Sequence, residues 1–150
     1  MIIFKALIKH IGIIFLLGFF SLTAFSAVLE MNRFYIHVNG KVLVCECTDN
    51  TSSKALLEKL KISDVEIDMS DYGSFEKVGD LGFTLPQNNE AIITAPGDVI
   101  LYQGRMITIY YSENTWNFTY LARIPDVTKQ SLLEILGQGD VTVTFSMAKE

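Results

Sequence analysis

The chain has 150 residues with 12 basic and 17 acidic side chains, which gives a net charge of −5. An acidic chain without a basic stripe repels phosphate backbones, so nucleic acid is excluded as an expected partner. The length suits a single domain with a core large enough to be stable without disulfide staples.

The first 26 residues have the pattern of a secretory signal peptide. Lys5 and Lys9 precede an apolar run over residues 11–20, and a stretch of small residues follows it. We predict that residues 1–26 are removed and that residues 27–150 are periplasmic or secreted, touching a membrane only through the signal before cleavage. Retention as an N-terminal anchor is the alternative, although the apolar run is short of the roughly 20 residues that a spanning helix needs. Loss of both lysines leaves 10 basic against 17 acidic residues, a net charge of −7.

Short strands separated by turns follow the signal segment. Apolar residues recur at every second position over residues 33–38, and Asn39-Gly40 predicts a hairpin because both turn positions need positive φ. The register of this turn puts Cys45 and Cys47 on the inward, apolar face of the next strand. His37 then lies on the opposite face of the hairpin.

A helix, a strand and a long loop are expected next. Thr51 or Ser52 can cap a short helix whose apolar side ends at Leu60. Strand spacing returns over residues 62–69, and a loop over residues 70–86 follows it. Long ordered loops often carry function, which makes this one a candidate for a binding loop.

The second half of the chain predicts further strands and one more helix. Pro96-Gly97 fits the centre of a type II turn, and Thr128 can cap a short helix that stops at Gly137. The expected strands cover residues 91–95, 99–102, 106–111, 118–124 and 141–145. About eight short strands with two short helices favour a mainly β fold, either a barrel or a sandwich, and in a barrel the helices would cover the open ends.

Several motifs occur in the order of a known family. They are Asp71-Tyr72-Gly73, Leu85-Pro86, Pro96-Gly97-Asp98, Leu101-Tyr102-Gln103-Gly104 and Gly137-Gln138-Gly139-Asp140. In this order they resemble the bacterial cyclophilin-like proteins of uncharacterised function, over nearly the whole chain after the signal. The resemblance implies a closed antiparallel cyclophilin-like β-barrel of about eight strands with two short helices. It implies no established activity and no cofactor, and relatives of this domain sometimes accompany flavodoxin-like redox proteins, which suggests such proteins as partners.

The resemblance raises peptidyl-prolyl cis-trans isomerase activity as an alternative function. True cyclophilins carry a Phe-His-Arg motif, a downstream Gln and an aromatic pocket for proline, and their Arg stabilises the twisted amide electrostatically. This chain has no Phe-His-Arg motif, since Val38 follows His37, and neither Arg105 nor Arg123 stands in a matching motif. We therefore expect a non-catalytic domain and keep the isomerase as the alternative.

Histidine, thiol and metal chemistry are not expected. His37 is the only imidazole outside the signal segment, and its expected role is that of a solvent-facing strand histidine. Cys45 and Cys47 lack the further ligands of a structural zinc site, and their spacing along one strand would strain a disulfide. We expect two buried thiols. The alternating acids from Asp64 to Asp68 lack the glycine-containing loop of a calcium site, so we expect no metal.

Aromatic residues with polar tips make the best candidate site. Pockets for small molecules are mainly apolar with a few polar groups, and Tyr and Trp serve both needs. We predict a site at the barrel mouth that uses the loop over residues 71–86 and binds a small molecule or a peptide segment. The predicted ligand-binding residues are Tyr72, Phe75, Glu76, Lys77, Tyr102, Tyr110, Trp116, Tyr120 and Arg123.

Overall fold

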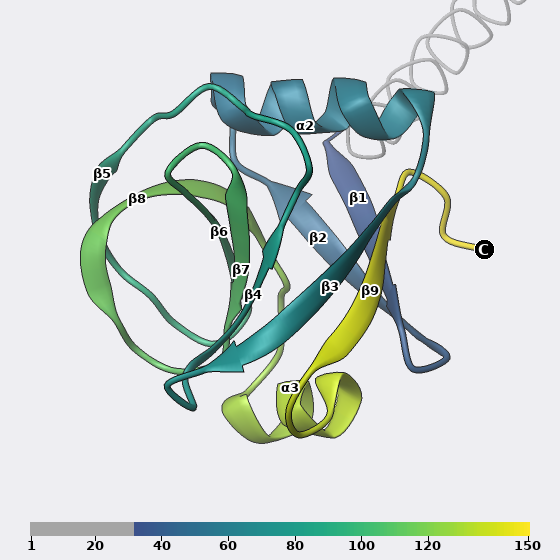
Figure 1. Cartoon of the computed structure of the whole chain (residues 1–150), viewed down its shortest axis with the longest axis vertical. Coiled ribbons are helices and arrows are strands. Elements are labelled where there is room, and N and C mark those ends of the chain that lie inside the picture. Colours follow the sequence, from purple (N-terminus) through teal and green to yellow (C-terminus); the bar gives the residue numbers. More distant parts are fainter. Residues whose placement is uncertain (1–31) are drawn as a thin grey trace, which may run out of the picture. The chain divides into compact units, whose positions relative to one another are not determined.

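The computed structural model describes residues 32–150, so the predicted signal segment and its cleavage site lie outside the described residues. Nine strands and two helices occur in this part of the chain (Figure 1). The strands are β1 (Arg33–Val38), β2 (Lys41–Cys47), β3 (Val65–Tyr72), β4 (Glu76–Asp80), β5 (Glu90–Ile93), β6 (Asp98–Tyr102), β7 (Met106–Tyr110), β8 (Thr115–Arg123) and β9 (Val141–Ser146). The helices are α2 (Thr51–Ile62) and α3 (Lys129–Leu136). Neither of these two helices is long and apolar enough to cross a membrane.

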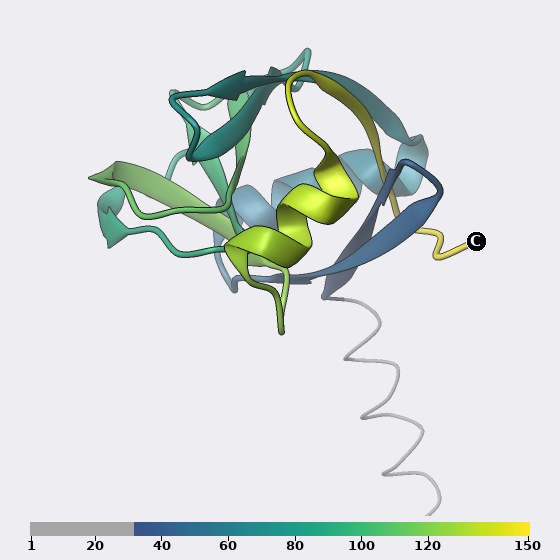
Figure 2. The same ribbon diagram turned by 90° about the horizontal axis from the view of Figure 1, so that it is seen from below.

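Eight of the strands form a closed antiparallel barrel. Neighbouring strands follow the order β2-β1-β9-β3-β4-β7-β6-β8, and β8 pairs with β2 to close the ring. The ninth strand, β5, pairs with β8 outside this ring. Figures 1 and 2 both place α2 and α3 on opposite sides of the barrel. The predicted mainly β fold, with a closed barrel and two short helices, is therefore confirmed.

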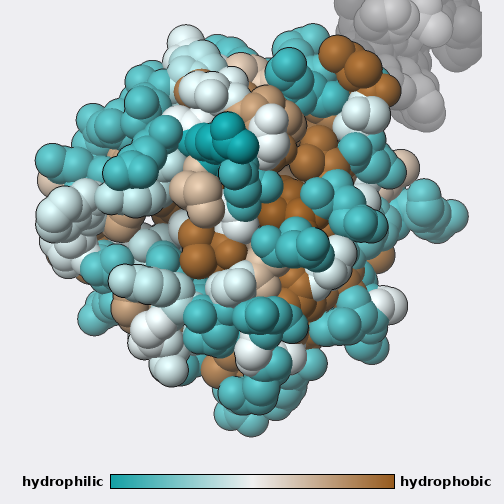
Figure 3. Space-filling model, viewed as in Figure 1, coloured by the Kyte–Doolittle hydropathy of each residue, from teal (hydrophilic) through white to brown (hydrophobic). Residues whose placement is uncertain are grey.

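One apolar core fills the barrel. The rings of Phe34 and Phe145, on the paired strands β1 and β9, stack with their centroids 5.1 Å apart. Leu56 of α2 and Leu132 of α3 are fully buried in the same cluster, so both helices are held by the core that they cover. Hydrophilic side chains dominate the periphery of the face in Figure 3, and apolar side chains show near its centre.

The helix caps follow from polar side chains at the first turns. Asn50 caps α2, because its side chain accepts a hydrogen bond from the Ser53 N–H at 2.8 Å. The prediction of Thr51 or Ser52 as this cap was wrong, since both lie inside the first turn of the helix. Thr128 caps α3 as predicted.

The segment predicted as a loop over residues 70–86 contains a strand. β3 continues to Tyr72, the chain turns at Gly73 and Ser74, where φ is positive, and β4 begins at Glu76. The prediction missed β4 because three of its five residues are charged and one is glycine. Its ladders to β3 and β7, rather than its own sequence pattern, make it a strand.

β8 changes its pairing partner along its length. Its second half pairs with β6, where Leu121 is the extra residue of a bulge that shifts the register between Val99 and Ile100. Its first half, from Thr115 to Phe118, pairs with β5. We call this two-stranded segment the β5–β8 ribbon. In Figure 1 it lies beside β6 and β7, on the outer side of the barrel.

Candidate functional site

A cavity of about 350 Å³ lies on the outer face of the barrel, between strands β4, β7 and β6 and the β5–β8 ribbon. Strand alternation explains its floor. Glu76 pairs with Tyr110, and Val78 pairs with Thr108, so these four side chains share the outer face of the β4–β7 ladder. Lys77 lies between Glu76 and Val78 in sequence and therefore points to the inner side of the sheet, where it is fully buried.

Aromatic rings form most of the cavity lining and contact one another. Phe75 stacks on Tyr110 with ring centroids 6.2 Å apart, and Tyr110 lies 5.8 Å from Phe118. Phe118 in turn meets the ring of Tyr102 edge-on at 6.0 Å. These contacts connect the turn before β4, strands β6 and β7 and the ribbon through one continuous aromatic surface. The six aromatic lining residues are Tyr72, Phe75, Tyr102, Tyr110, Trp116 and Phe118.

Two of these rings form the rim of the cavity. The side chains of Tyr72 and Trp116 are each 61% exposed, while Tyr110 is almost fully buried in the floor. Tyr72 ends β3 and Trp116 lies on the ribbon, so the opening is bounded by two separate parts of the chain. Large aromatic side chains exposed beside a cavity are typical of a surface that contacts a ligand.

Glu76 is the carboxylate of this cavity. It is 7% exposed, and among the described residues its Oε2 atom has no hydrogen-bond partner. Burial raises the pKa of the Glu76 carboxyl, and hydrogen bonding from Tyr110 opposes that rise in part. The described lining contains no Lys, Arg or His side chain, so the negative charge of Glu76 is not neutralised within the cavity.

The structure brings together most of the predicted ligand-binding residues and separates three of them. Those that line the cavity are Tyr72, Phe75, Glu76, Tyr102, Tyr110 and Trp116. Those that lie elsewhere are Lys77, Tyr120 and Arg123. Sequence reasoning missed the lining residues Val78, Met106, Thr108, Asn114 and Phe118. Phe118 carried a usable signal, because it lies two positions from Trp116 and so shares its strand face.

Comparison with known proteins identifies the family. The model of the cyclophilin-like family matches residues 36–146, which is most of the chain. The chain belongs to the cyclophilin-like family. The cyclophilin-like domain also matches the solution structure of a hypothetical protein from Archaeoglobus fulgidus, with a TM-score of 0.56 and 12% sequence identity, over 77% of this chain and 94% of that one. This likeness shows the fold alone, and comparison with curated proteins finds no match.

Tyr120 and Arg123 of the cyclophilin-like domain hold a turn. The Tyr120 hydroxyl and Arg123 Nη1 both donate to Asp98 Oδ1, the latter at 2.8 Å. Asp98 Oδ2 accepts the Ala95 N–H at 2.8 Å, which fixes the turn around Gly97 where φ is +95°. Both predicted residues therefore serve the junction of β6 and β8 in this structure.

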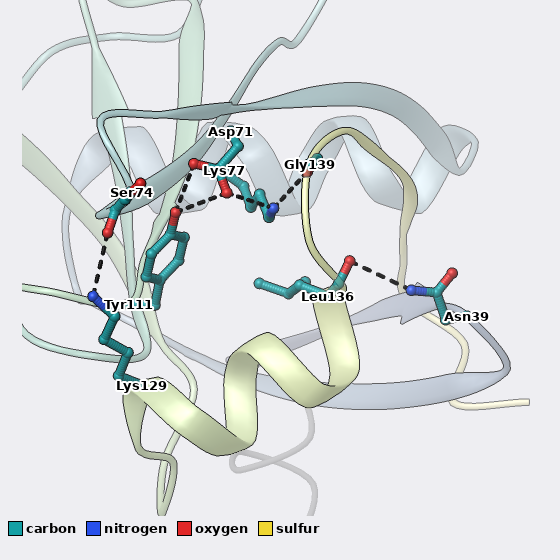
Figure 4. A network of polar contacts seen from close by, with 8 residues as sticks. All are labelled: Asn39, Asp71, Ser74, Lys77, Tyr111, Lys129, Leu136 and Gly139. Atoms are coloured by element: carbon teal, nitrogen blue, oxygen red, sulfur yellow. Dashed lines mark hydrogen bonds and ion pairs between the residues drawn. The ribbon is translucent and has the colours of Figure 1, made fainter.

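Lys77 belongs to a buried polar network on the inner side of the sheet (Figure 4). Its Nζ donates to Asp71 Oδ2 at 2.8 Å and to the carbonyl of Gly139. The Tyr111 hydroxyl donates to both carboxylate oxygens of Asp71 at 2.9 Å. The hydrogen bond from Lys77 holds the pKa of Asp71 below its usual range. This network joins β3 and β4 to the loop between α3 and β9.

His37 lies beside the backbone near the C-terminus, and the two cysteines lie in the core. Nε2 of His37 lies 2.9 Å from the Ala148 carbonyl, at a partly exposed strand position. Cys45 and Cys47 are buried in the core. Burial raises the pKa of both thiols, that of Cys47 to about 12, which disfavours the reactive thiolate.

Substituting Glu76 tests whether this carboxylate is placed at a cost to stability. Because its pKa in the folded state is raised, the folded chain binds more protons than the unfolded chain above the ordinary value of 4.5. The wild-type domain should therefore lose stability as pH rises from 4.5 through the folded-state pKa of Glu76. Glu76→Gln should raise the free energy of unfolding at pH 7 by about 1 kcal/mol, and this gain should vanish below pH 4.5.

Urea unfolding of both proteins between pH 4 and pH 8 measures this difference. Glu66→Gln, which removes an exposed carboxylate from β3, is the matched control and should change stability little at any pH. A loss of stability in Glu76→Gln at pH 7 would show that Glu76 stabilises the fold, contrary to our expectation.

Proposed function

We propose that this cyclophilin-like domain is a non-catalytic binding module that takes a small molecule, or a peptide segment of similar size, into the cavity on the outer face of the barrel. The observation that carries the proposal is the cavity itself. Its volume of about 350 Å³ falls among ligand pockets, and six aromatic rings with one buried carboxylate line it. Such a lining offers apolar contact area together with a polar group that can orient a ligand.

The position of the cavity on the barrel also supports binding. Its floor belongs to paired strands of the closed sheet, so the floor side chains are held before a ligand arrives, which reduces the entropy lost on binding. The proposed site lies on the side wall of the barrel rather than at the predicted barrel mouth, because α2 and α3 pack against the barrel core. Export of residues 27–150 and association with flavodoxin-like proteins stay predictions.

The surroundings of the two candidate arginines favour binding over peptidyl-prolyl isomerisation. The Nε atom of Arg105 lies 2.8 Å from both carboxylate oxygens of Asp80, and Arg123 is paired with Asp98. Neither arginine lines the cavity. A proline peptide in the cavity would therefore meet no guanidinium that could stabilise a twisted amide.

Trp116 provides a direct test of binding, because it is the only tryptophan of the chain and lies on the cavity rim. We expect saturable changes in its fluorescence on titration with at least one member of a panel of cationic, neutral and anionic small molecules and proline-containing tetrapeptides. Native mass spectrometry of the freshly purified domain would identify a ligand that co-purifies. Absence of binding by every member at millimolar concentration would contradict the proposal.

A proline-peptide isomerisation assay on the same protein tests whether the domain is non-catalytic. We expect the rate to equal that of the uncatalysed peptide. Catalysis that disappears in Arg105→Ala or Arg123→Ala would overturn the non-catalytic role and favour peptidyl-prolyl isomerase activity.

A further inference from the structure

Glu76 has a buried carboxylate with no basic side chain beside it in the described cavity lining. Its side chain is 7% exposed, and Oε2 has no hydrogen-bond partner in the described part of the chain. The neighbouring Lys77 is committed to Asp71 on the other side of the sheet. Buried polar groups are nearly always paired, so a buried carboxylate oxygen without a partner in a cavity wall indicates a group that a ligand completes.

The rings around Glu76 restrict what that ligand is. Tyr110 lies beside Glu76 in the β4–β7 ladder, and Phe75 and Phe118 contact the ring of Tyr110. The face of an aromatic ring is the negative side of its quadrupole and attracts cations, especially organic ammonium ions. The described lining thus combines aromatic rings and one carboxylate with no basic side chain, a composition that suits a cation better than an anion.

We propose that the cavity selects an organic cation of the alkylammonium class, with its alkyl groups against the aromatic rings and its positive charge directed toward Glu76. This inference rests on the proposed function of the cavity as a binding site. An anion would meet Glu76 without a compensating cation, and a neutral apolar ligand would leave Glu76 Oε2 buried without a partner. A bare divalent metal ion needs several oxygen ligands, whereas the described lining offers one carboxylate.

A pair of probes with nearly the same shape tests the charge requirement. Choline carries a trimethylammonium group, and 3,3-dimethyl-1-butanol replaces its nitrogen with carbon and so lacks the charge. Titration into the wild-type domain, followed by Trp116 fluorescence and by the NMR signal of the Met106 methyl group, should give choline at least about tenfold tighter binding. This comparison needs no variant and so does not depend on the folding of one.

Two variants then locate the source of the preference. Glu76→Gln keeps the side-chain shape and should weaken choline binding about tenfold while changing dimethylbutanol binding less than twofold. Glu66→Gln removes the same charge from an exposed position on β3 that does not line the cavity, and it should leave both affinities unchanged.

The outcomes separate this inference from the proposed function. Equal or tighter binding of dimethylbutanol to the wild-type domain, or choline affinity unchanged in Glu76→Gln, overturns the cation preference. Failure of choline to bind at millimolar concentration overturns it as well. If neutral members of the panel still bind, the cavity remains a binding site for another class of ligand. If nothing binds, both proposals fail.

Discussion

Replacing Asp71 with asparagine is expected to lower the free energy of unfolding by about 3 kcal/mol, whereas Lys77→Met should cost about 1 kcal/mol or less. The two partners differ in exposure, because the Lys77 side chain is fully buried and that of Asp71 is 25% exposed. Without the carboxylate, the buried ammonium keeps only neutral acceptors such as the Gly139 carbonyl. Without the ammonium, Asp71 keeps the Tyr111 hydroxyl and its contact with solvent, and methionine fills the volume of the lysine stem.

Urea unfolding of the two single variants and the double variant measures this asymmetry. The double variant should be close in stability to Lys77→Met alone, which corresponds to a coupling of about 3 kcal/mol, the full cost of Asp71→Asn. The matched control is Asp80→Asn, which breaks an ion pair with Arg105 whose two side chains are about half exposed. That change should cost much less than Asp71→Asn, because solvent screens the half-exposed pair. Equal costs for Asp71→Asn and Lys77→Met would contradict the role that we assign to the burial of Lys77.

The pH dependence of the same network has a defined sign. The folded-state pKa of Asp71 lies below the ordinary value of 3.8, so the stabilisation is complete above that pH and is lost as pH falls through the folded-state pKa. The cost of Asp71→Asn should therefore shrink in acid. A cost that stays constant down to pH 2 would show that the charge of Asp71 is not what stabilises the network.

Local signals predicted those parts of the fold that depend on turns and caps. Asn39-Gly40 gave the first hairpin, whose register places Val38 opposite Lys41 as expected. Thr128 gave the start of α3. β4 could not be found in this way, because a strand with Glu76 and Lys77 at its start looks like a loop until its neighbours bury both side chains. Long-range pairing, which no local pattern contains, decides such an element.

The residue types of the candidate site could be predicted from the sequence, but the strand faces on which those residues lie could not. The choice of aromatic residues with polar tips brought together six of nine residues that line one cavity, and their role in binding stays a prediction. The sequence places Glu76 and Lys77 on one binding loop, whereas in the structure they are adjacent strand residues and point to opposite faces. Thr108 and Val78 were missed because they look like ordinary strand residues. Only the bend of β8 away from the barrel turns their strand face into a cavity floor.

Filling the cavity from its floor is expected to weaken binding strongly without unfolding the domain. Val78 is partly buried, lines the cavity and points away from the barrel core, so Val78→Phe adds a ring to the cavity volume and not to the core. Every ligand that perturbs Trp116 in the wild-type domain should bind at least about thirtyfold more weakly, a loss of about 2 kcal/mol. The melting temperature should change by less than about 2 °C, because no core side chain is displaced.

Val42→Phe is the matched control, since Val42 is 41% exposed on β2 and does not line the cavity. It should leave both affinity and melting temperature near their wild-type values. Wild-type affinity in Val78→Phe, or an equal loss in Val42→Phe, would place binding elsewhere on the domain. Val78→Phe removes volume and should weaken cationic and neutral ligands alike, whereas Glu76→Gln removes charge and should weaken only the cation. The two variants therefore assign affinity to the cavity and selectivity to one carboxylate by separate measurements.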